Sequence, residues 1–341
     1  MPRSKRVTIA DIARQAGVSP GAVSFALNGR PGVSEETRQR ILAIADQHDW
    51  RPSSTARALV GAHAGVIGFA VNRPARTLGT EAFFTDLIAG VQSSLAARRI
   101  GMQLVVVPTL EEELDTYRRW RRANQVDGVL VLDPRVDDPR PELLRTLGLP
   151  SITIGGQPSP DGEHATLWLD DSAAAETVFG YLARLGHRHI VYISGAAAHE
   201  HVRLRRGVLD AMSARGVRGE VVETDYSPSQ VSTVMRSLLS RAELPTAVVF
   251  DNDMMAIAGL RVTQEMGVRV PGELSLASFD DSIVTGLVHP SITCLTRDTF
   301  LLGERAADFL LEQLDASEVL PDRMGPVPTL TVRESTGRPQ G

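Results

Sequence analysis

Apolar side chains recur at helical spacing in two adjacent segments close to the start of the chain. Thr8 can cap the first helix, and Gly17 provides the positive φ angle that ends it. Ser19 can cap a second helix that carries Pro20 in its first turn and buries Val23. Two helices joined by a short glycine turn are typical of the motif whose second helix enters the major groove of DNA. An ordinary helical hairpin is the alternative interpretation.

A third amphipathic segment completes this small unit. Ser34 begins a helix over residues 35–49, whose apolar positions can cover the first two helices. We therefore predict an all-α helix-turn-helix headpiece over residues 1–52. Residues 53–61 contain helix-forming side chains but are too few for a helix that is stable in water, which indicates a hinge.

From Gly65 onward the pattern changes to short apolar runs that alternate with helical stretches. Runs such as residues 66–71 and 247–250 are typical of buried parallel strands that helices cover on both faces. The series is interrupted near residues 155–164, which predicts an α/β core of two doubly wound lobes with a cleft between them. Ligands of such sheets bind at the carboxyl ends of the strands.

The distribution of charge also separates the predicted headpiece from the predicted core. Residues 1–60 hold nine basic and five acidic side chains, although the whole chain has a net charge of −5. A basic module on an acidic body fits DNA contact by the small part alone. No apolar run is long enough to span a membrane, and the start of the chain lacks the apolar stretch of a secretory signal. The single Cys294 excludes an internal disulfide.

The chain resembles the LacI/GalR (lactose-repressor) family of bacterial transcription regulators in seven segments that follow the family's order. These are TIADIARQAGVS, AVSFALNGRPGVSEETRQRI, WRPSSTARAL, GHRHIVYISG, FDNDMMAIAGL, LSLASFDD and HPSITCLTRD. The resemblance implies a headpiece, a hinge helix that DNA orders, and an effector-binding and dimerisation core (residues 62–341) of periplasmic-binding-protein type. Because the chain of such a core crosses between the lobes three times, lobe 1 is expected at about 62–160 plus 290–322, and lobe 2 at about 161–289 plus 323–341.

The resemblance also implies which side chains meet DNA. Family members read bases from the positions of Pro20, Gly21 and Phe25, which here offer no polar side-chain group, so we expect direct readout to be narrow. Leu59 matches a leucine that wedges into the minor groove and kinks the duplex, unless it is simply a linker residue. The polar residues among the expected DNA contacts could equally be helix caps. The expected contacts are Thr8, Ser19, Pro20, Gly21, Ser24, Phe25, Asn28, Arg30, Ala56 and Leu59.

The resemblance places an effector pocket in the cleft. Two phenylalanines begin the first core helix and Tyr226 supplies a second aromatic position, although helix-to-sheet packing is the plainer role for at least one phenylalanine. Asp280 follows a strand, and Asp253 could be no more than a helix cap. Either Arg203 or Arg205 could enter the cleft, because the loop before them is one residue short. The expected effector-binding residues are Phe83, Phe84, His199, Arg203, Arg205, Tyr226, Asn252, Asp253, Asp280 and Arg297.

Aromatic faces beside carboxylate, amide and guanidinium groups suit the ring and the hydroxyls of a sugar. The sequence contains no nucleophile elbow, phosphate-binding loop or dinucleotide motif, so we expect neither an enzyme nor a cofactor. His199 and His201 flank Glu200, but such a surface triplet is more often solvated than metal-bound.

We therefore expect a cytoplasmic, nucleoid-associated homodimer that has no contact with a membrane and binds double-stranded operator DNA. It would repress carbohydrate-utilisation genes, and a small sugar-like effector would switch its binding to DNA. A regulator that responds to a nucleoside or purine is the alternative. A solute-binding protein is disfavoured by the headpiece and by the missing signal, and a doubly wound metabolic enzyme by the missing motifs.

Overall fold

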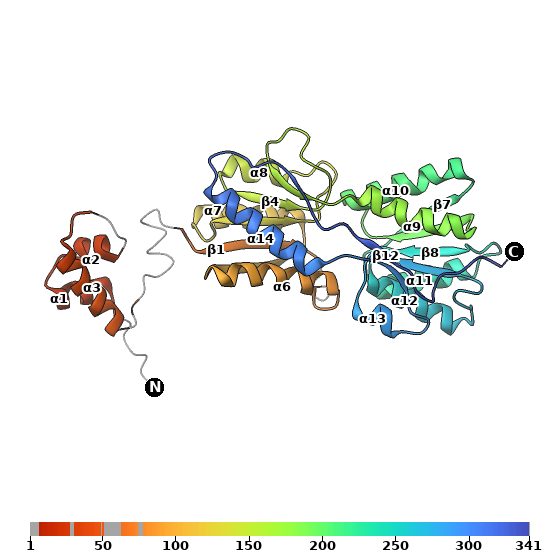
Figure 1. Ribbon diagram of the computed structural model, residues 1–341, viewed down its shortest axis with the longest axis horizontal. Coiled ribbons are helices and arrows are strands. Elements are labelled where there is room, and N and C mark those ends of the chain that lie inside the picture. The colour runs from red at the N-terminus through yellow and green to blue at the C-terminus, as the bar shows by residue number, and fades with distance from the viewer. Residues whose placement is uncertain (1–6, 28–30, 49, 51–62, 74–77, 341) are drawn as a thin grey trace. The chain divides into compact units, whose positions relative to one another are not determined.

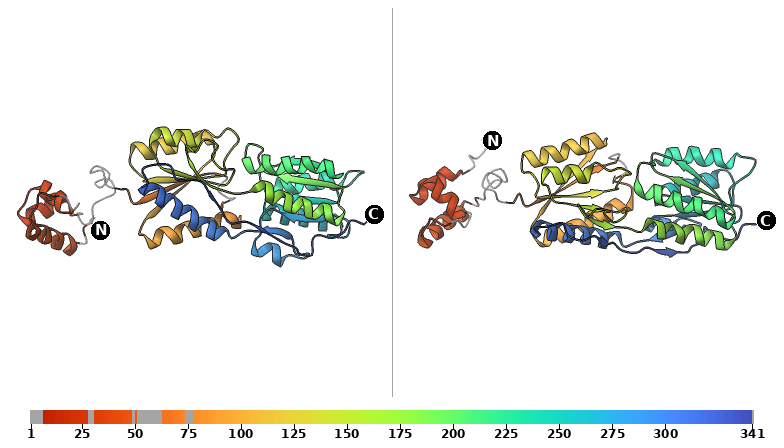
Figure 2. Two further views of the ribbon diagram at one scale, coloured as in Figure 1. Left: turned by 45° about the horizontal axis from the view of Figure 1, so that its top comes forward. Right: turned by 90° about the horizontal axis from the view of Figure 1, so that it is seen from above.

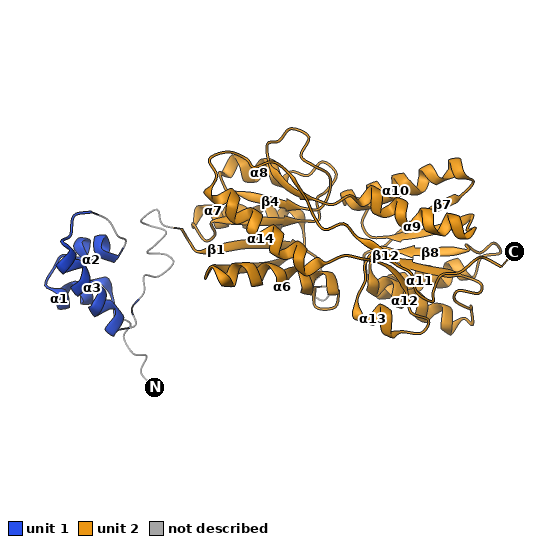
Figure 3. Ribbon diagram, viewed as in Figure 1, with its two compact units in different colours: residues 1–62 blue, residues 63–341 orange. Residues whose placement is uncertain are grey.

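The structure is a computed structural model that describes residues 7–27, 31–48, 50, 63–73 and 78–340 (Figure 1). The chain divides into two compact units, Met1–Ala62 and His63–Gly341 (Figure 3). Among the described residues, no helix is both long enough and apolar enough to cross a membrane.

The first unit is the predicted headpiece. Its helices are α1 (Ile9–Ala16), α2 (Pro20–Leu27) and α3 (Glu35–Gln47). All three helices bury apolar side chains in one small core, which is built around Ile12, Val23 and Ile41. The sequence prediction of a helix-turn-helix followed by a third, covering helix is confirmed.

Local signals in the sequence set the ends of these helices. The Thr8 hydroxyl accepts a hydrogen bond from the Asp11 backbone N–H at 3.3 Å, and the Asp11 carboxylate accepts one from the Thr8 backbone N–H at 3.0 Å. This reciprocal pair is a capping box. Gly17 ends α1 with a φ angle of 69°, a left-handed conformation that glycine adopts without strain.

Lobe 1 of the second unit is a parallel sheet with helices on both faces (Figure 2). The strand order is β11-β5-β4-β3-β1-β2. Helices α6 and α14 bury apolar side chains on one face, and α7 and α8 on the other. The elements are β1 (Val66–Asn72), α6 (Ala82–Ala97), β2 (Gly101–Val107), α7 (Leu110–Arg122), β3 (Gly128–Leu132), α8 (Arg140–Leu147), β4 (Ser151–Ile154), β5 (Ala165–Trp168), α14 (Thr299–Asp315) and β11 (Arg323–Met324).

Lobe 2 repeats this architecture with the strand order β12-β10-β9-β8-β6-β7, in which only the β10–β12 pair is antiparallel. Helices α9 and α10 cover one face of the sheet, and α11 and α12 cover the other. The elements are α9 (Asp171–Leu185), β6 (His189–Ser194), α10 (Glu200–Ala211), the 3₁₀ helix η1 (Met212–Arg215), β7 (Arg218–Glu223), α11 (Pro228–Leu239), β8 (Ala247–Phe250), α12 (Asp253–Glu265), β9 (Ser275–Ser278), α13 (Ile283–Leu287), β10 (Thr293–Thr296) and β12 (Thr329–Thr331).

The chain passes between the two sheets three times, as the resemblance implied, but the passages lie later than expected. Strand β5 pairs with β4, so residues 161–168 belong to lobe 1 and not to lobe 2. Strand β10 pairs with β9 in lobe 2, and β11 pairs with β5 in lobe 1. The passages therefore follow β5, β10 and β11. An apolar run of four residues predicts a buried strand but carries no information about which of two sheets it joins.

Two glycines allow α6 and α14 of lobe 1 to touch backbone to backbone. A Cβ atom added at Gly90 would lie 2.0 Å from the carbonyl oxygen of Phe300. One added at Gly303 would lie 2.2 Å from the carbonyl oxygen of Leu87. Beside this contact, the Ser94 hydroxyl donates a hydrogen bond of 2.5 Å to Asp308. The returning helix is thus an integral part of lobe 1, although more than 200 residues separate the bonded side chains.

Candidate functional site

The headpiece exposes the face of α2 that the sequence assigned to DNA. Pro20 and Gly21 are exposed, and 42% of the Phe25 surface is accessible. The Ser19 hydroxyl accepts a hydrogen bond from the Ala22 N–H at 3.2 Å and so caps α2. Thr8 likewise caps α1, whereas Ser24 is half-buried. Four other expected DNA contacts lie outside the described residues: Asn28, Arg30, Ala56 and Leu59.

The second unit contains a cleft between its lobes, at the carboxyl ends of the strands of both sheets. Its cavity of about 70 Å³ has room for a few water molecules. Seven of the expected effector-binding residues line this cleft: Phe83, Phe84, Arg205, Tyr226, Asn252, Asp280 and Arg297. Further polar residues that the sequence did not assign to the cleft also line it: Arg73, Glu81, Asp133, Asp171, His201 and Asp251.

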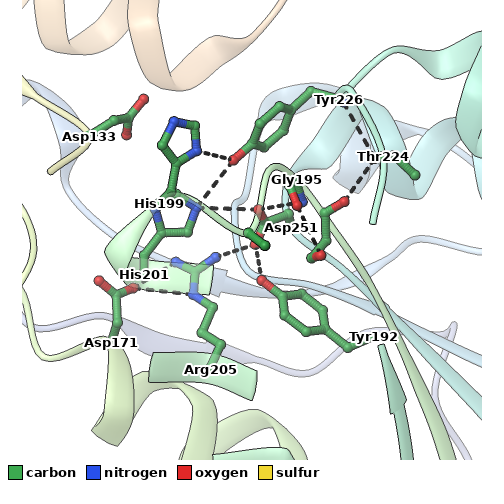
Figure 4. Close-up of polar contacts among 12 residues, drawn as sticks. Asp133, Asp171, Tyr192, Gly195, His199, His201, Arg205, Thr224, Tyr226 and Asp251 are labelled. Carbon is green, nitrogen blue, oxygen red and sulfur yellow. Dashed lines mark hydrogen bonds and ion pairs between the residues drawn. The ribbon is translucent and has the colours of Figure 1, made fainter. Parts of the chain in front are cut away.

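An ion-pair network inside lobe 2 forms one wall of the cleft (Figure 4). The buried Arg205 guanidinium donates hydrogen bonds of 2.7 Å to Asp171 and to Asp251. The Tyr192 hydroxyl also donates to Asp251, and His201 Nε2 lies 3.3 Å from the same carboxylate. Burial alone would raise the pKa of Asp251, but His201 and Arg205 hold it well below its usual range. This carboxylate is therefore ionised and fully paired.

The structure shows which of the two candidate arginines enters the cleft. Arg205 lies on the buried face of α10, whereas the half-exposed Arg203 side chain pairs with Glu200 at 3.3 Å outside the cleft. His201 lines the cleft from the same helix, four residues before Arg205. His199 immediately precedes this helix and is not a lining residue; its Nδ1 is 2.9 Å from the Tyr226 hydroxyl. Burial lowers the pKa of His199 to about 3, so the ring is neutral.

Asn252 and Asp253 have different positions, although they are neighbours in the sequence. Asn252 Oδ1 accepts a hydrogen bond of 2.9 Å from the Met255 N–H and so caps α12. Its buried amide nitrogen has no hydrogen-bond partner among the described residues, and Asn252 lines the cleft. The Asp253 carboxylate accepts from the Met254 N–H at 2.8 Å and does not line the cleft. Of these two neighbours, only Asn252 therefore offers a free donor to a ligand in the cleft.

The three aromatic side chains expected in the cleft contribute unequally to its surface. Phe83 and Phe84 meet edge to face with their ring centres 5.5 Å apart, but Phe84 is fully buried in the core of lobe 1. Tyr226 has a φ angle of 66°, and its ring lies directly over Gly195, where an added Cβ would be 1.7 Å from the ring. The missing side chain at Gly195 thus makes room for an aromatic ring in the cleft.

Contacts between the lobes hold the cleft closed. The Arg73 guanidinium of lobe 1 lies 4.0 Å from the centre of the Tyr226 ring of lobe 2, and it also pairs with Asp133 at 2.7 Å. Beside them, the loops 134–136 and 198–200 form an antiparallel bridge, which we call the clasp. In the clasp, the Val136 N–H donates to the Ala198 carbonyl and the Glu200 N–H to the Pro134 carbonyl, both at 2.9 Å.

Comparison with known proteins agrees with this architecture. Residues 8–53 match the family described as bacterial regulatory proteins, lacI family, and residues 179–336 match the periplasmic binding protein-like domain. The HTH-type transcriptional repressor PurR of Mannheimia succiniciproducens is 28% identical over 335 residues, which cover 96% of this chain and 98% of PurR. The solved transcriptional regulator CelR–cellobiose complex is 28% identical, has a TM-score of 0.72, and covers 97% of this chain and 100% of its own.

The HTH-type transcriptional regulator CelR of Thermobifida fusca is 30% identical over 342 residues, which cover 98% of this chain and 100% of CelR. This similarity runs through the headpiece and both lobes. It places the chain in the LacI family of bacterial regulatory proteins, which regulate transcription by binding DNA and are not enzymes.

Proposed function

We propose that this regulator represses carbohydrate-utilisation genes and that a small sugar-like effector in the cleft switches its binding to operator DNA. The observation that carries the proposal is the set of cleft groups without a bonding partner among the described residues. These are the amide nitrogen of Asn252 and the guanidinium Nε atoms of Arg73 and Arg297. A buried donor or acceptor without a partner is costly, so a ligand that bonds to all three is stabilised.

A sugar supplies both kinds of contact that the cleft offers. Its hydroxyls donate to carboxylates and accept from amides and guanidinium groups. Its C–H faces pack on aromatic rings, and Phe83 and Tyr226 line the cleft on either side. The related CelR has been solved with cellobiose, which supports a carbohydrate. Nucleosides and purines, which the sequence left open as the alternative effectors, are the second class of ligand for the same experiment.

The contacts between the lobes provide the switch. A sugar ring that stacks on Tyr226 would compete with Arg73 for the face of that ring. A sugar that displaces Arg73 from this ring acts on the contacts between the lobes, so we expect binding to change the separation of the lobes and to strain the clasp. A ligand shifts such an equilibrium only by its preference for one arrangement, and nearly complete switching needs a preference of ~10⁴-fold. The change reaches the headpiece through the segment that joins the two units.

The proposal is tested by measuring binding of the full chain to its own upstream DNA by fluorescence anisotropy, with and without sugars and nucleosides. We expect salt-dependent binding to DNA and a change in affinity of at least about tenfold with one sugar. Residues 63–341, which form a compact unit with their own cores, serve as the control. This unit is expected to bind the same sugar and no DNA. A response to purines alone would contradict the carbohydrate assignment.

The proposed regulator acts as a homodimer, because paired headpieces match a two-fold operator. Since it binds DNA of the nucleoid, its proposed location is the cytoplasm. The surface of lobe 2 supports a second copy as partner. On helix α13, Ile283 and Leu287 are 81% and 78% exposed, and Val284 beside them is also exposed. Apolar side chains that cluster in this way are typical of an interface.

Replacing Leu287 by glutamate is expected to weaken the dimer at least about tenfold, because it would place two carboxylates in an apolar contact. Sedimentation velocity over a range of concentrations measures the dissociation constant. Leu244→Glu, at an exposed apolar residue outside α13, is the matched control and should leave the dimer intact. Equal dissociation constants for Leu287→Glu and the unchanged chain would show that α13 is not the interface.

A further inference from the structure

Two carboxyl groups face the cleft from opposite lobes without a bonded basic partner. Glu81 lies directly before α6 in lobe 1, and Asp280 follows β9 in lobe 2. Both residues line the cleft. Among the described residues, neither carboxyl group accepts a hydrogen bond or forms an ion pair. We call these two groups, which are available to bond to a ligand, the carboxyl pair.

The remaining charges of the cleft are largely neutralised within the protein. Asp133 pairs with Arg73 at 2.7 Å, and Asp171 and Asp251 share Arg205. Arg297 is the remaining guanidinium among the lining residues, and no carboxylate of the described chain lies within ion-pair distance of it. The lining residues together carry five carboxyl groups and three guanidinium groups. The cleft thus has an excess of acid that arginine does not compensate.

Burial makes this excess costly. It raises the pKa of Glu81 to about 8 and that of Asp280 to about 7, and the Asp280 carboxyl group further raises the pKa of Glu81. At a pH above both values the two carboxyl groups are ionised, and another negative charge in the same poorly hydrated space is then repelled. A hydroxyl or ammonium group, by contrast, would supply the donor that both carboxyl groups lack.

We propose that Glu81 and Asp280 select effectors by charge. They accept hydrogen bonds from hydroxyl or ammonium groups of a neutral or amino sugar, and they exclude phosphorylated sugars and sugar acids. Glu81 thereby gives lobe 1 a direct part in recognition, opposite the polar groups of lobe 2. This inference rests on the proposed function, since it names the class of sugar that the cleft takes.

The test is isothermal titration calorimetry of the full chain with matched ligands at pH 9, above the pKa values of Glu81 and Asp280, where both carboxyl groups are ionised. Glucose, galactose and mannose are each titrated as the parent sugar, the 2-amino sugar, the uronic acid and the 6-phosphate. In every set that binds, the parent or the amino sugar is expected to bind at least about tenfold tighter than both anionic forms. Glu81→Gln preserves the shape of the side chain and is expected to reduce this ratio at least about threefold.

Glu111→Gln is the matched control, because it removes one exposed acid on α7 outside the cleft and should leave the ratio unchanged. A uronic acid or a sugar phosphate that binds as tightly as its parent would overturn the inference and leave the sugar assignment intact. An unchanged ratio in Glu81→Gln, with wild-type thermal unfolding, would overturn the role of Glu81. If no sugar of any form binds while operator DNA does, the proposed function itself fails.

Discussion

Replacing Arg205 by methionine is expected to lower the free energy of unfolding of the core by about 3–5 kcal/mol at pH 7.5. The guanidinium is buried, bonds to Asp171 and Asp251, and lies 4.2 Å from the centre of the Phe279 ring. Methionine retains much of the apolar length but leaves two buried carboxylates without their cation. Urea or thermal unfolding of residues 63–341 measures the loss.

The loss is expected to depend on pH. In the unchanged protein the pKa of Asp251 is lowered, so its contribution to stability is present above the usual carboxyl range and is lost as the pH falls below that range toward the lowered pKa. Without Arg205 this pKa rises, because one of the cations that favour the ionised carboxylate is gone while the burial remains, so the penalty grows as the pH rises above the usual range. The variant should therefore differ less from wild type at pH 5 than at pH 7.5.

Arg206→Met serves as the control for this experiment. Arg206 is exposed, and its nearest carboxylate, that of Asp210, is 3.8 Å away, so the change should stay within about 0.5 kcal/mol. Equal stability of the Arg205→Met and Arg206→Met variants at pH 7.5 would refute a structural role for the buried network.

Replacing Gly90 by alanine is expected to destabilise lobe 1 by about 2–3 kcal/mol. The added Cβ would lie 2.0 Å from the Phe300 carbonyl oxygen, and a backbone atom cannot rotate away as a side chain can. Helix α6 therefore has to separate from α14 along the contact that Gly303 also forms. The shift in the midpoint of thermal unfolding measures the effect.

Gly207→Ala is the matched control for Gly90→Ala. Gly207 also lies inside a helix, α10, but it is exposed and an added Cβ would meet nothing within 4 Å. Alanine there should stabilise the core by about 0.5–1 kcal/mol, because it restricts the unfolded chain and favours the helix. Equal changes in stability in the two variants would show that the contact between α6 and α14 does not require glycine at position 90.

Much of the fold was predictable because its signals are local. Helix caps such as Thr8, the glycine at position 17 and the period of the apolar residues lie within a few positions of the elements that they define. The assignment of strands to lobes was not predictable in the same way. Strands β5 and β10 are four residues long, and only their hydrogen-bonded neighbours decide which sheet they join.

The site was predictable where a side chain directly follows a strand. Asn252 and Asp280 were found by this rule, and Asp133 and Asp251 obey it as well but were not singled out. Helical spacing could have identified His201, since it lies one turn before Arg205 on α10. No such regularity marks Glu81, whose place in the cleft depends on how the loop after β1 leads into α6. Whether these residues bind an effector stays a prediction.

The return of the chain to lobe 1 has a consequence for synthesis. By the time the ribosome has added Asp298, the strands β1–β5 and helix α6 have long been made, but α14 has not. Until that helix arrives, apolar side chains of α6 and of the sheet, such as Leu87 and Ile152, lack part of their cover. The nascent chain is therefore most exposed to aggregation in the lobe that emerges first, and lobe 2 completes most of its sheet before lobe 1 is finished.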